Sequence, residues 1–176
     1  MGKKNHYKDD EITFRVMVDA DIFQLTEWLM DPVVLGWFPM SNLKEVQDAT
    51  KIWQAYARKN ASFTVEVNGK PAGMAIVYVN PFEKLKYQSL FAIVVGKEYR
   101  GKGVGSLLLK YIMKQARDTF GIKLFHLEVY EGNPAYRLYL RHGFVEYGRH
   151  ERFLKKADGT YDAKIHMQID LTKAEL

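Results

Sequence analysis

The stretch Tyr99-Arg100-Gly101-Lys102-Gly103-Val104-Gly105-Ser106 lies between an apolar run and a segment with helical periodicity. Three glycines in five positions allow a tight turn and leave backbone N–H groups uncovered where the helix begins. The positive end of a helix dipole, about half an elementary charge, favours an anion at such a place. Arg100 and Lys102 add mobile positive charge beside these amides. The stretch therefore predicts a phosphate-binding turn, and a pyrophosphate suits it well.

Three phosphate-binding patterns compete for this turn. A Walker A loop requires a lysine between its last glycine and the following Ser or Thr, but here Ser106 follows Gly105 directly. A dinucleotide fingerprint requires a third glycine at position 106, which is serine. The pattern Arg/Gln-x-x-Gly-x-Gly/Ala is matched fully by Arg100, Gly103 and Gly105. A glycine-rich turn that holds no ligand also remains open, because the pattern is short.

The elements next to the turn form a strand–helix–strand unit. Apolar residues recur at helical spacing from Val104 to Phe120, and Gly121 suits a left-handed helix end. The segments Tyr87–Val95 and Leu124–Val129 are apolar enough to be strands. Since a helix connects them, we expect the two strands to be parallel.

Further out, the sequence predicts strands, helices and two hairpins on both sides of this unit. Asn68-Gly69 and Asp158-Gly159 are the turn signals of the hairpins. Before the unit we expect a strand at Ile12–Met17, a helix from a cap at Asp19 to Asp31-Pro32, a helix from a capping box at Asn42 and Glu45 to about Lys59, and strands at Ser62–Val67 and Pro71–Val79. After it we expect a helix from Pro134 to about His142 and strands at Phe144–Phe153 and Tyr161–Leu171.

This order of elements predicts an α/β fold of the α+β type. We expect one domain over residues 1–176, with a mixed, mostly antiparallel sheet of about seven strands and helices on both faces. Residues 1–10 are polar and charged, and we expect them to be a flexible segment.

Composition excludes several classes of protein. The 176 residues include no cysteine, which excludes disulfides and a thiolate metal site or nucleophile, and we expect no metal. The net charge of +5 favours a polyanionic ligand, but the basic residues are scattered rather than arranged as a nucleic-acid-binding stripe. No apolar run is long enough to span a membrane, and residues 1–10 lack the apolar core of a signal peptide. We expect a cytoplasmic protein that binds neither nucleic acid nor membrane.

A second motif identifies a family. Leu127-Glu128-Val129-Tyr130 is followed by Asn133-Pro134-Ala135 and then by Leu138-Tyr139-Leu140-Arg141-His142-Gly143-Phe144. With the turn at Arg100–Gly105, this arrangement resembles the GCN5-related N-acetyltransferase (GNAT) family over Tyr87–Phe144. In one respect it departs from the family, since Asn133 and Tyr139 are six residues apart where seven is common.

The resemblance implies a donor, acetyl-CoA, and the residues that bind it. In the family this turn grips the pyrophosphate, and the strand before it supplies backbone contacts to the pantetheine arm. The donor-binding residues implied here are Ile93, Val94, Val95, Arg100, Gly101, Lys102, Gly103, Val104, Gly105, Ser106 and Asn133.

Acetyl transfer to an amine sets three tasks for the protein. A base must deprotonate the amine, whose reference pKa is about 10.4, and Glu128, His126 or a water molecule remain open for this role. Backbone N–H groups near Ile93 or Val94 are expected to stabilise the oxyanion. Tyr139 is expected to donate a hydrogen bond or a proton to the departing thiolate. An aromatic residue that only packs in the core remains the alternative for Tyr139.

The acceptor is not identified by the sequence. Trp28, Trp37, Phe38, Pro39 and Met40 either seat the apolar part of a substrate or cover the core, and Phe153 and Tyr161 flank the last turn. We expect an N-acetyltransferase that uses acetyl-CoA and a primary amine in a ternary complex, where the amine belongs to a small molecule or to a protein N-terminus or lysine. The alternative is a non-catalytic acyl-CoA-binding module, and assembly as a homodimer stays open.

Overall fold

Seven strands form one sheet in the order β1-β2-β3-β4-β5-β7-β6 in the computed structural model, which describes residues 6–175. The strands are β1 (Ile12–Val16), β2 (Ser62–Val67), β3 (Lys70–Val79), β4 (Gln88–Val95), β5 (Leu124–Tyr130), β6 (Val145–Lys155) and β7 (Tyr161–Asp170). All neighbouring strands are antiparallel except β4 and β5, which are parallel. The prediction of a mixed, mostly antiparallel sheet of about seven strands is confirmed.

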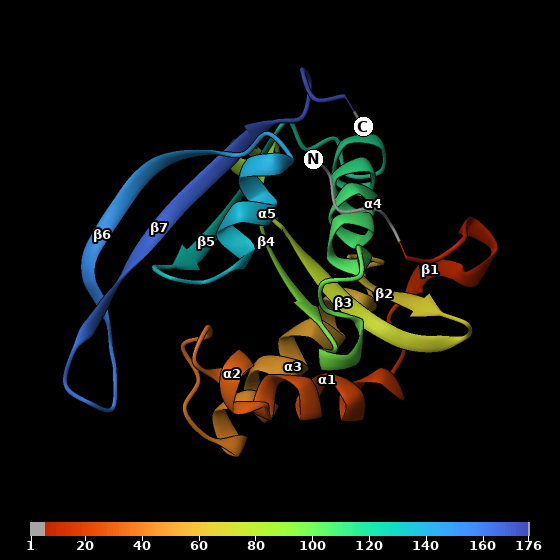
Figure 1. Ribbon diagram of the computed structural model, residues 1–176. Helices are drawn as coiled ribbons and strands as arrows, with labels where there is room; N and C mark the ends of the chain where they lie inside the picture. The colour runs from red at the N-terminus through yellow and green to blue at the C-terminus, as the bar shows by residue number, and fades with distance from the viewer. Residues whose placement is uncertain (1–5, 176) are drawn as a thin grey trace.

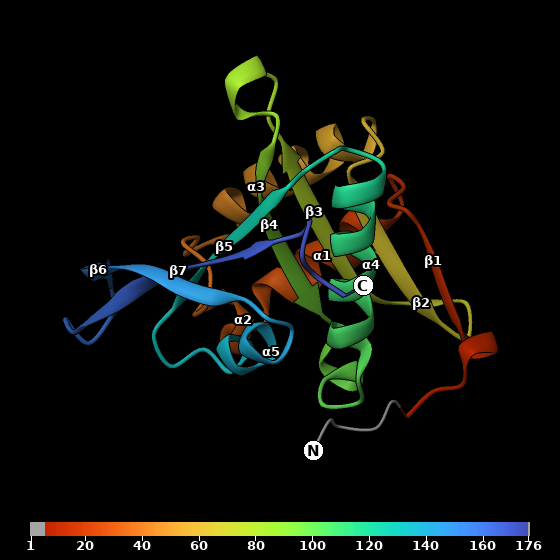
Figure 2. The same cartoon turned by 90° about the horizontal axis from the view of Figure 1, so that it is seen from above.

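Helices cover both faces of the sheet, as the sequence predicts (Figure 1). On one face lie α1 (Asp21–Met30), α2 (Pro32–Leu35) and α3 (Leu43–Ala57), and on the other lie α4 (Val104–Asp118) and α5 (Ala135–Arg141). Short 3₁₀ helices are η1 (Asp9–Glu11), η2 (Glu83–Leu85) and η3 (Lys97–Tyr99). The β6–β7 hairpin projects beyond the helices at one end of the sheet (Figures 1 and 2).

The core has two layers because alternate side chains of each central strand point to opposite faces. Val77 and Phe91 pack toward α4, whose buried residues include Leu108 and Ile112. Met74, Ile76 and Val94 pack toward α1 and α3, together with Leu25 and Trp53. The sheet thus separates a helical layer of α4 and α5 from a helical layer of α1 to α3.

Most of the turn and cap signals act as predicted. Asn68 and Gly69 have φ values of 51° and 73°, as a hairpin turn of two left-handed residues requires. Asn42 caps α3 by accepting a hydrogen bond from the Glu45 N–H at 3.0 Å. The Glu45 carboxylate returns to the N–H and hydroxyl of Ser41, so the capping box is displaced by one residue.

The predicted helix cap at Asp19 is wrong. Helix α1 begins at Asp21, two residues later, and Asp19 instead accepts a hydrogen bond from the Gln54 side chain at 2.7 Å. Asp21 is the residue whose carboxylate binds the local backbone, since it accepts from the Val18 N–H at 2.9 Å. Arg15 holds it there with two further hydrogen bonds of 2.6 and 2.8 Å, a tertiary contact that local pattern does not reveal.

Asp31-Pro32 ends α1 as predicted, but it also starts the short helix α2, which the sequence analysis missed. The Asp31 carboxylate accepts from the Val33 N–H at 2.9 Å, and Pro32 occupies the first helical position. The chain therefore turns directly from α1 into α2, and Trp37 and Phe38 lie in the loop between α2 and α3.

The prediction of a flexible segment at residues 1–10 lies partly outside the described residues. Within the described part, the His6 N–H donates to the Lys102 carbonyl at 3.3 Å, and Asp9–Glu11 form η1. Across residues 6–175 no helix is both long and apolar enough to cross a bilayer.

Candidate active site

Strands β4 and β5 are joined at one end only. Their pairing covers Gln88–Leu90 with Leu124–His126, and it stops there. From Phe91 to Val95, β4 continues beside β3, while β5 continues beside β7. The two parallel strands diverge toward the end where α4 begins (Figure 2). The sheet thus opens along an edge of β4.

A cavity of about 1120 Å³ occupies this opening. Every residue of β4 from Leu90 to Val95 lines it. Since consecutive strand residues point to opposite faces, the cavity runs along the free edge of β4 rather than over one face. Residues of α3, such as Ile52, and of α4, such as Lys110, line the same cavity from opposite sides of the sheet.

The glycine turn lies at the wall of this cavity. Gly101 and Gly103 have φ values of 75° and 96°, a region that other residues rarely adopt. Gly103 is the N-cap of α4 and offers no side-chain acceptor, and no acidic residue stands in the first turn of this helix. The Ser106 N–H already donates to the Gly103 carbonyl at 3.0 Å, so the Val104 and Gly105 N–H groups are the ones left for an external acceptor, and the helix dipole favours an anionic one.

Trp28 of α1 fixes the start of the turn. Its indole lies against Gly96, where a Cβ would meet three indole atoms at 2.9 to 3.0 Å. Trp28 is 7% exposed and belongs to the core layer of α1 and α3. The chain can leave β4 along this path only because position 96 has no side chain.

Arg100 is fastened rather than mobile, which corrects the expectation from the sequence. Its Nε donates to the Val95 carbonyl at 3.0 Å, and its Nη2 lies 3.6 Å from the Asp31 carboxylate. Nη2 is buried and is the one buried side-chain nitrogen or oxygen among residues 6–175 without a hydrogen-bond partner. Because Nη2 is covered and lies beside the Asp31 carboxylate, the guanidinium fixes the turn to the end of β4 and to the start of α2.

Ser106 connects the turn to α5. Its Oγ lies 2.6 Å from Nε2 of His142, and both residues line the cavity. Burial lowers the pKa of His142, and the positive charges of Lys110 and Arg141 lower it further. A neutral imidazole at this place joins the first turn of α4 to the end of α5.

Two of the predicted donor-binding residues have side chains outside the cavity lining. Lys102 is exposed, and Val104 is fully buried in the core layer of α4. Any contact of Val104 with a ligand would have to come from its backbone. Of the predicted donor-binding residues, Ile93, Val94, Val95, Arg100, Gly101, Gly103, Gly105, Ser106 and Asn133 line the cavity.

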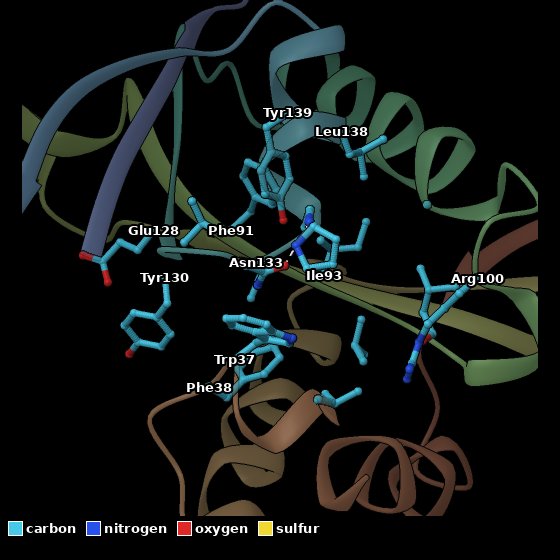
Figure 3. Close-up of a pocket in the computed structure, with 18 of the residues that line it drawn as sticks. Trp37, Phe38, Phe91, Ile93, Arg100, Glu128, Tyr130, Asn133, Leu138 and Tyr139 are labelled. Atoms are coloured by element: carbon cyan, nitrogen blue, oxygen red, sulfur yellow. Dashed lines mark hydrogen bonds between the residues drawn. The ribbon is translucent and has the colours of Figure 1, made fainter. Parts of the chain in front are cut away.

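Asn133 organises the start of α5. Its Oδ1 accepts from the Ala135 N–H at 2.9 Å, and its own N–H donates to the Tyr130 carbonyl at 3.1 Å. The side chain thus holds the β5–α5 connection in place and also faces the cavity (Figure 3).

Tyr139 enters the cavity from α5. Its ring packs edge-on against Phe91 and Phe144 at centroid distances of 5.9 Å each, and the residue is 6% exposed. Figure 3 shows its hydroxyl directed into the space between α5 and the opposite wall. Burial raises the pKa of the Tyr139 hydroxyl above its ordinary value, so the group remains protonated at neutral pH.

Glu128 lies at another end of the cavity and is held in an ion pair. Its carboxylate lies 3.0 Å from Lys164 Nζ and 3.7 Å from His166 Nδ1, both on β7. His126 is absent from the described cavity lining, and its Nε2 is hydrogen-bonded to the Gln88 side chain. Burial lowers the pKa of His126, which leaves the ring neutral at pH 7. Of the two candidate bases, Glu128 is the one that faces the cavity.

The sequence matches the acetyltransferase (GNAT) family over residues 23–144, which is more than half of the chain. The chain belongs to this family. Its resemblance to the family in the turn and in the Tyr139 motif is thereby confirmed, and the fold confirms it independently.

Individual acetyltransferases are also similar to this chain. It is 31% identical over 134 residues to the streptothricin acetyltransferase of Streptomyces lavendulae, a match that covers 75% of this chain and 68% of that protein. It is 30% identical over 98 residues to an uncharacterized N-acetyltransferase of Methanocaldococcus jannaschii, covering 53% of this chain and less than half, 43%, of that one. The structure of yncA from Salmonella typhimurium, solved with its cofactor acetyl-CoA, superimposes with a TM-score of 0.79 at 21% identity over 94% of this chain and 97% of that one.

Several cavity residues of this acetyltransferase were missed from the sequence. His142 precedes Gly143-Phe144 in the second motif, and its place beside that motif was the only local signal for it. Leu138 stands in the same motif, but its apolar side chain gave no sign of a cavity; Phe91 gave no signal, because an apolar residue that lines a cavity has the same pattern as one in the core. The sequence left open whether four further residues bind a substrate or cover the core. All four line the cavity: Trp37, Phe38, Pro39 and Met40.

Proposed function

We propose that this acetyltransferase transfers the acetyl group of acetyl-CoA to a primary amine by direct attack in a ternary complex. One observation carries the proposal: the uncapped start of α4 and the Tyr139 hydroxyl face the same cavity, which runs along the free edge of β4. An anion-binding helix end and a protonated phenol are the two groups that a phosphorylated thioester donor requires.

The residues of the cavity fit this donor. The first N–H groups of α4, with Gly101 and Gly103 giving close access, would hold the pyrophosphate. Arg100 would hold the turn in place for this ligand through its hydrogen bond to the Val95 carbonyl and its ion pair with Asp31. The free edge of β4 at Ile93, Val94 and Val95 would hold the pantetheine arm through its backbone.

The chain then supplies three functions around the reacting atoms. The amine nitrogen forms a bond to the acetyl carbonyl carbon as the carbon–sulfur bond breaks. One amine proton passes to Glu128, directly or through water. The sulfur leaves either as the thiol, with the proton of the Tyr139 hydroxyl, or as a thiolate that accepts a hydrogen bond from this hydroxyl and then takes a proton from water. Backbone N–H groups near Ile93 or Val94 stabilise the carbonyl oxygen as it becomes negative. Acetyl-CoA contributes the activated acyl group, and no metal is used.

The alternative is a module that binds acyl-CoA without catalysis. Titration calorimetry with acetyl-CoA, together with release of CoA thiol across a panel of primary amines, separates the two. Binding with turnover supports the transferase, and binding without turnover on any amine supports the module. A folded protein that neither binds acetyl-CoA nor releases thiol would contradict both.

The setting of the enzyme is also proposed. We propose a cytoplasmic protein that binds neither nucleic acid nor membrane, which cell fractionation and a salt-dependent DNA-binding assay can check. Sedimentation equilibrium measures whether it forms a homodimer.

A further inference from the structure

We propose that the acceptor is an amine with a single positive charge carried on an apolar body the size of an aromatic ring system, and that polyamines are poor acceptors. This inference rests on the acetyl transfer proposed above. It concerns the end of the cavity that faces α1 to α3.

The wall that α1 to α3 contribute is entirely apolar. Every described residue between Leu29 and Trp53 that lines the cavity is apolar, Trp37 and Phe38 among them. Such a wall offers a second ammonium group ring faces but no carboxylate or hydrogen-bond acceptor from a side chain, so most of its lost hydration is not replaced. It does favour the burial of an apolar surface, at about 25 cal/mol per Å².

The mouth on this side is apolar as well. Val33 is 64% exposed and Ile52 is 48% exposed, and both line the cavity. Large apolar side chains that remain exposed at the rim of a cavity are a feature of binding surfaces. An acceptor with an apolar body would cover them.

Trp37 brings this wall close to the catalytic end. Its indole reaches the β5–α5 connection, where a Cβ at Gly132 would meet its Cη2 at 3.6 Å. Figure 3 shows Trp37 and Phe38 across the cavity from Tyr139, with Asn133 between. A group seated against the indole therefore lies next to the position where the thioester is expected.

Charge at this end suits one ammonium group and no more. Among the residues that the structure describes, Glu128 is the one carboxylate that lines the cavity at this end, and Lys164 and His166 already contact it. The other charged lining residues, Arg100, Lys110, Arg141 and Glu175, lie in the turn or on the α4 and α5 side. A net charge of +5 on the chain also repels a polycation during its approach.

Tyr130 extends the same surface toward the β6–β7 hairpin. It is 7% exposed, lines the cavity and stacks on Phe153 at a centroid distance of 6.1 Å. Burial and the nearby Glu128 raise the pKa of its hydroxyl, so the ring is uncharged at neutral pH. The body of the acceptor would thus lie between Trp37 and Phe38 on one side and Tyr130 on the other.

The test compares two acceptors of contrasting chemistry. Initial rates are measured with 2-phenylethylamine and with spermidine at saturating acetyl-CoA, by release of CoA thiol. We expect kcat/KM to be at least about tenfold higher for 2-phenylethylamine, the gain from placing one aromatic ring in the apolar cavity. A higher kcat/KM for spermidine overturns the inference and leaves the proposed function intact.

Variants connect the preference to the wall. Trp37→Ala should raise KM for 2-phenylethylamine about tenfold or more without changing the dissociation constant of acetyl-CoA. Phe23→Ala is the matched control, because Phe23 is an aromatic residue of α1 that is 73% exposed and absent from the described cavity lining. Equal kinetics for the two variants would overturn the assignment of the wall.

A second variant tests the acceptor preference by adding a charge at the mouth of the cavity, without removing a large side chain. Val33→Glu, at an exposed position, places a carboxylate that attracts the second ammonium group of spermidine. The kcat/KM for 2-phenylethylamine divided by that for spermidine should therefore fall about tenfold. An unchanged ratio contradicts the inference. Binding of acetyl-CoA without turnover on either amine also overturns the inference, whereas failure to bind acetyl-CoA overturns the proposed function itself.

Discussion

Tyr139 is the residue on which the proposed chemistry depends most. Its hydroxyl faces the cavity, and burial raises its pKa, so it is a proton donor rather than a phenolate at every pH at which the enzyme is expected to work. Tyr139→Phe should lower kcat by about 10²- to 10⁴-fold and leave the dissociation constant of acetyl-CoA unchanged. The rate of CoA thiol release gives kcat, and titration calorimetry gives the dissociation constant of acetyl-CoA. Tyr136→Phe, on the same helix but outside the described lining, is the control and should keep full activity.

His142 gives a prediction about pH at the same scale. Its pKa in the folded protein lies below the ordinary value of 6.5, because burial disfavours the charged ring. As pH falls, the unfolded chain therefore takes up a proton first, and stability that is fully present above about pH 6.5 is lost toward the lower folded pKa. The free energy of unfolding of the natural protein should fall between pH 7 and pH 5, and less steeply for His142→Gln.

His126 must be measured beside it, since burial lowers its pKa in the same direction. His126→Gln and the double variant show whether the two contributions add. A slope that is identical in the natural protein and in both single variants would contradict the role of these rings.

At the scale of elements, the path from β4 into α4 depends on Gly96. A Cβ there would meet the buried Trp28 indole at 2.9 Å, so Gly96→Ala should destabilise the fold by about 1 to 3 kcal/mol and weaken acetyl-CoA binding by displacing the turn. Gly148→Ala in β6, where the nearest atom would lie at 3.8 Å, is the matched control. Denaturant unfolding and calorimetry provide the measurements, and equal stability of the two variants would contradict the close contact.

The elements were predictable where the signal is local. The apolar period of Val104–Phe120, the glycine turn and the Asn68-Gly69 hairpin each act through neighbouring residues, and the structure has all three. The start of α1 was not predictable, because its N-cap is Ala20, which has no capping side chain, and the Asp21 carboxylate is held by the tertiary pairing with Arg15.

The same limit applies to the site. Tyr139 and the glycines stand at fixed distances within motifs and could be placed from sequence. The ion pair of Glu128 with Lys164 could not be predicted, because it depends on the register of β5 and β7. In that register Glu128 is paired with His166 and Tyr130 with Lys164, so Lys164 is a diagonal neighbour of Glu128. The approach of the Trp37 indole to Gly132 brings together segments almost a hundred residues apart, and no local pattern encodes it.

For the whole molecule, binding of the donor should be coupled to stability. Its proposed contacts come from β4, the turn, α4 and α5, which together hold the open half of the sheet. Acetyl-CoA at 100 times its dissociation constant should add about 2.7 kcal/mol to the free energy of unfolding and raise Tm by about 5 to 10 °C. Differential scanning calorimetry with and without the donor tests this, and an unchanged Tm at saturating donor would contradict donor binding.

The passage along the edge of β4 has a kinetic consequence, because residues of α3 and of α4 line it from opposite sides of the sheet. Because the cavity extends past both faces of the sheet, the two reactants can occupy it together, and neither has to leave before the other binds. Double-reciprocal plots at several fixed amine concentrations should therefore intersect rather than run parallel, as they would if the enzyme were acylated and released its first product early.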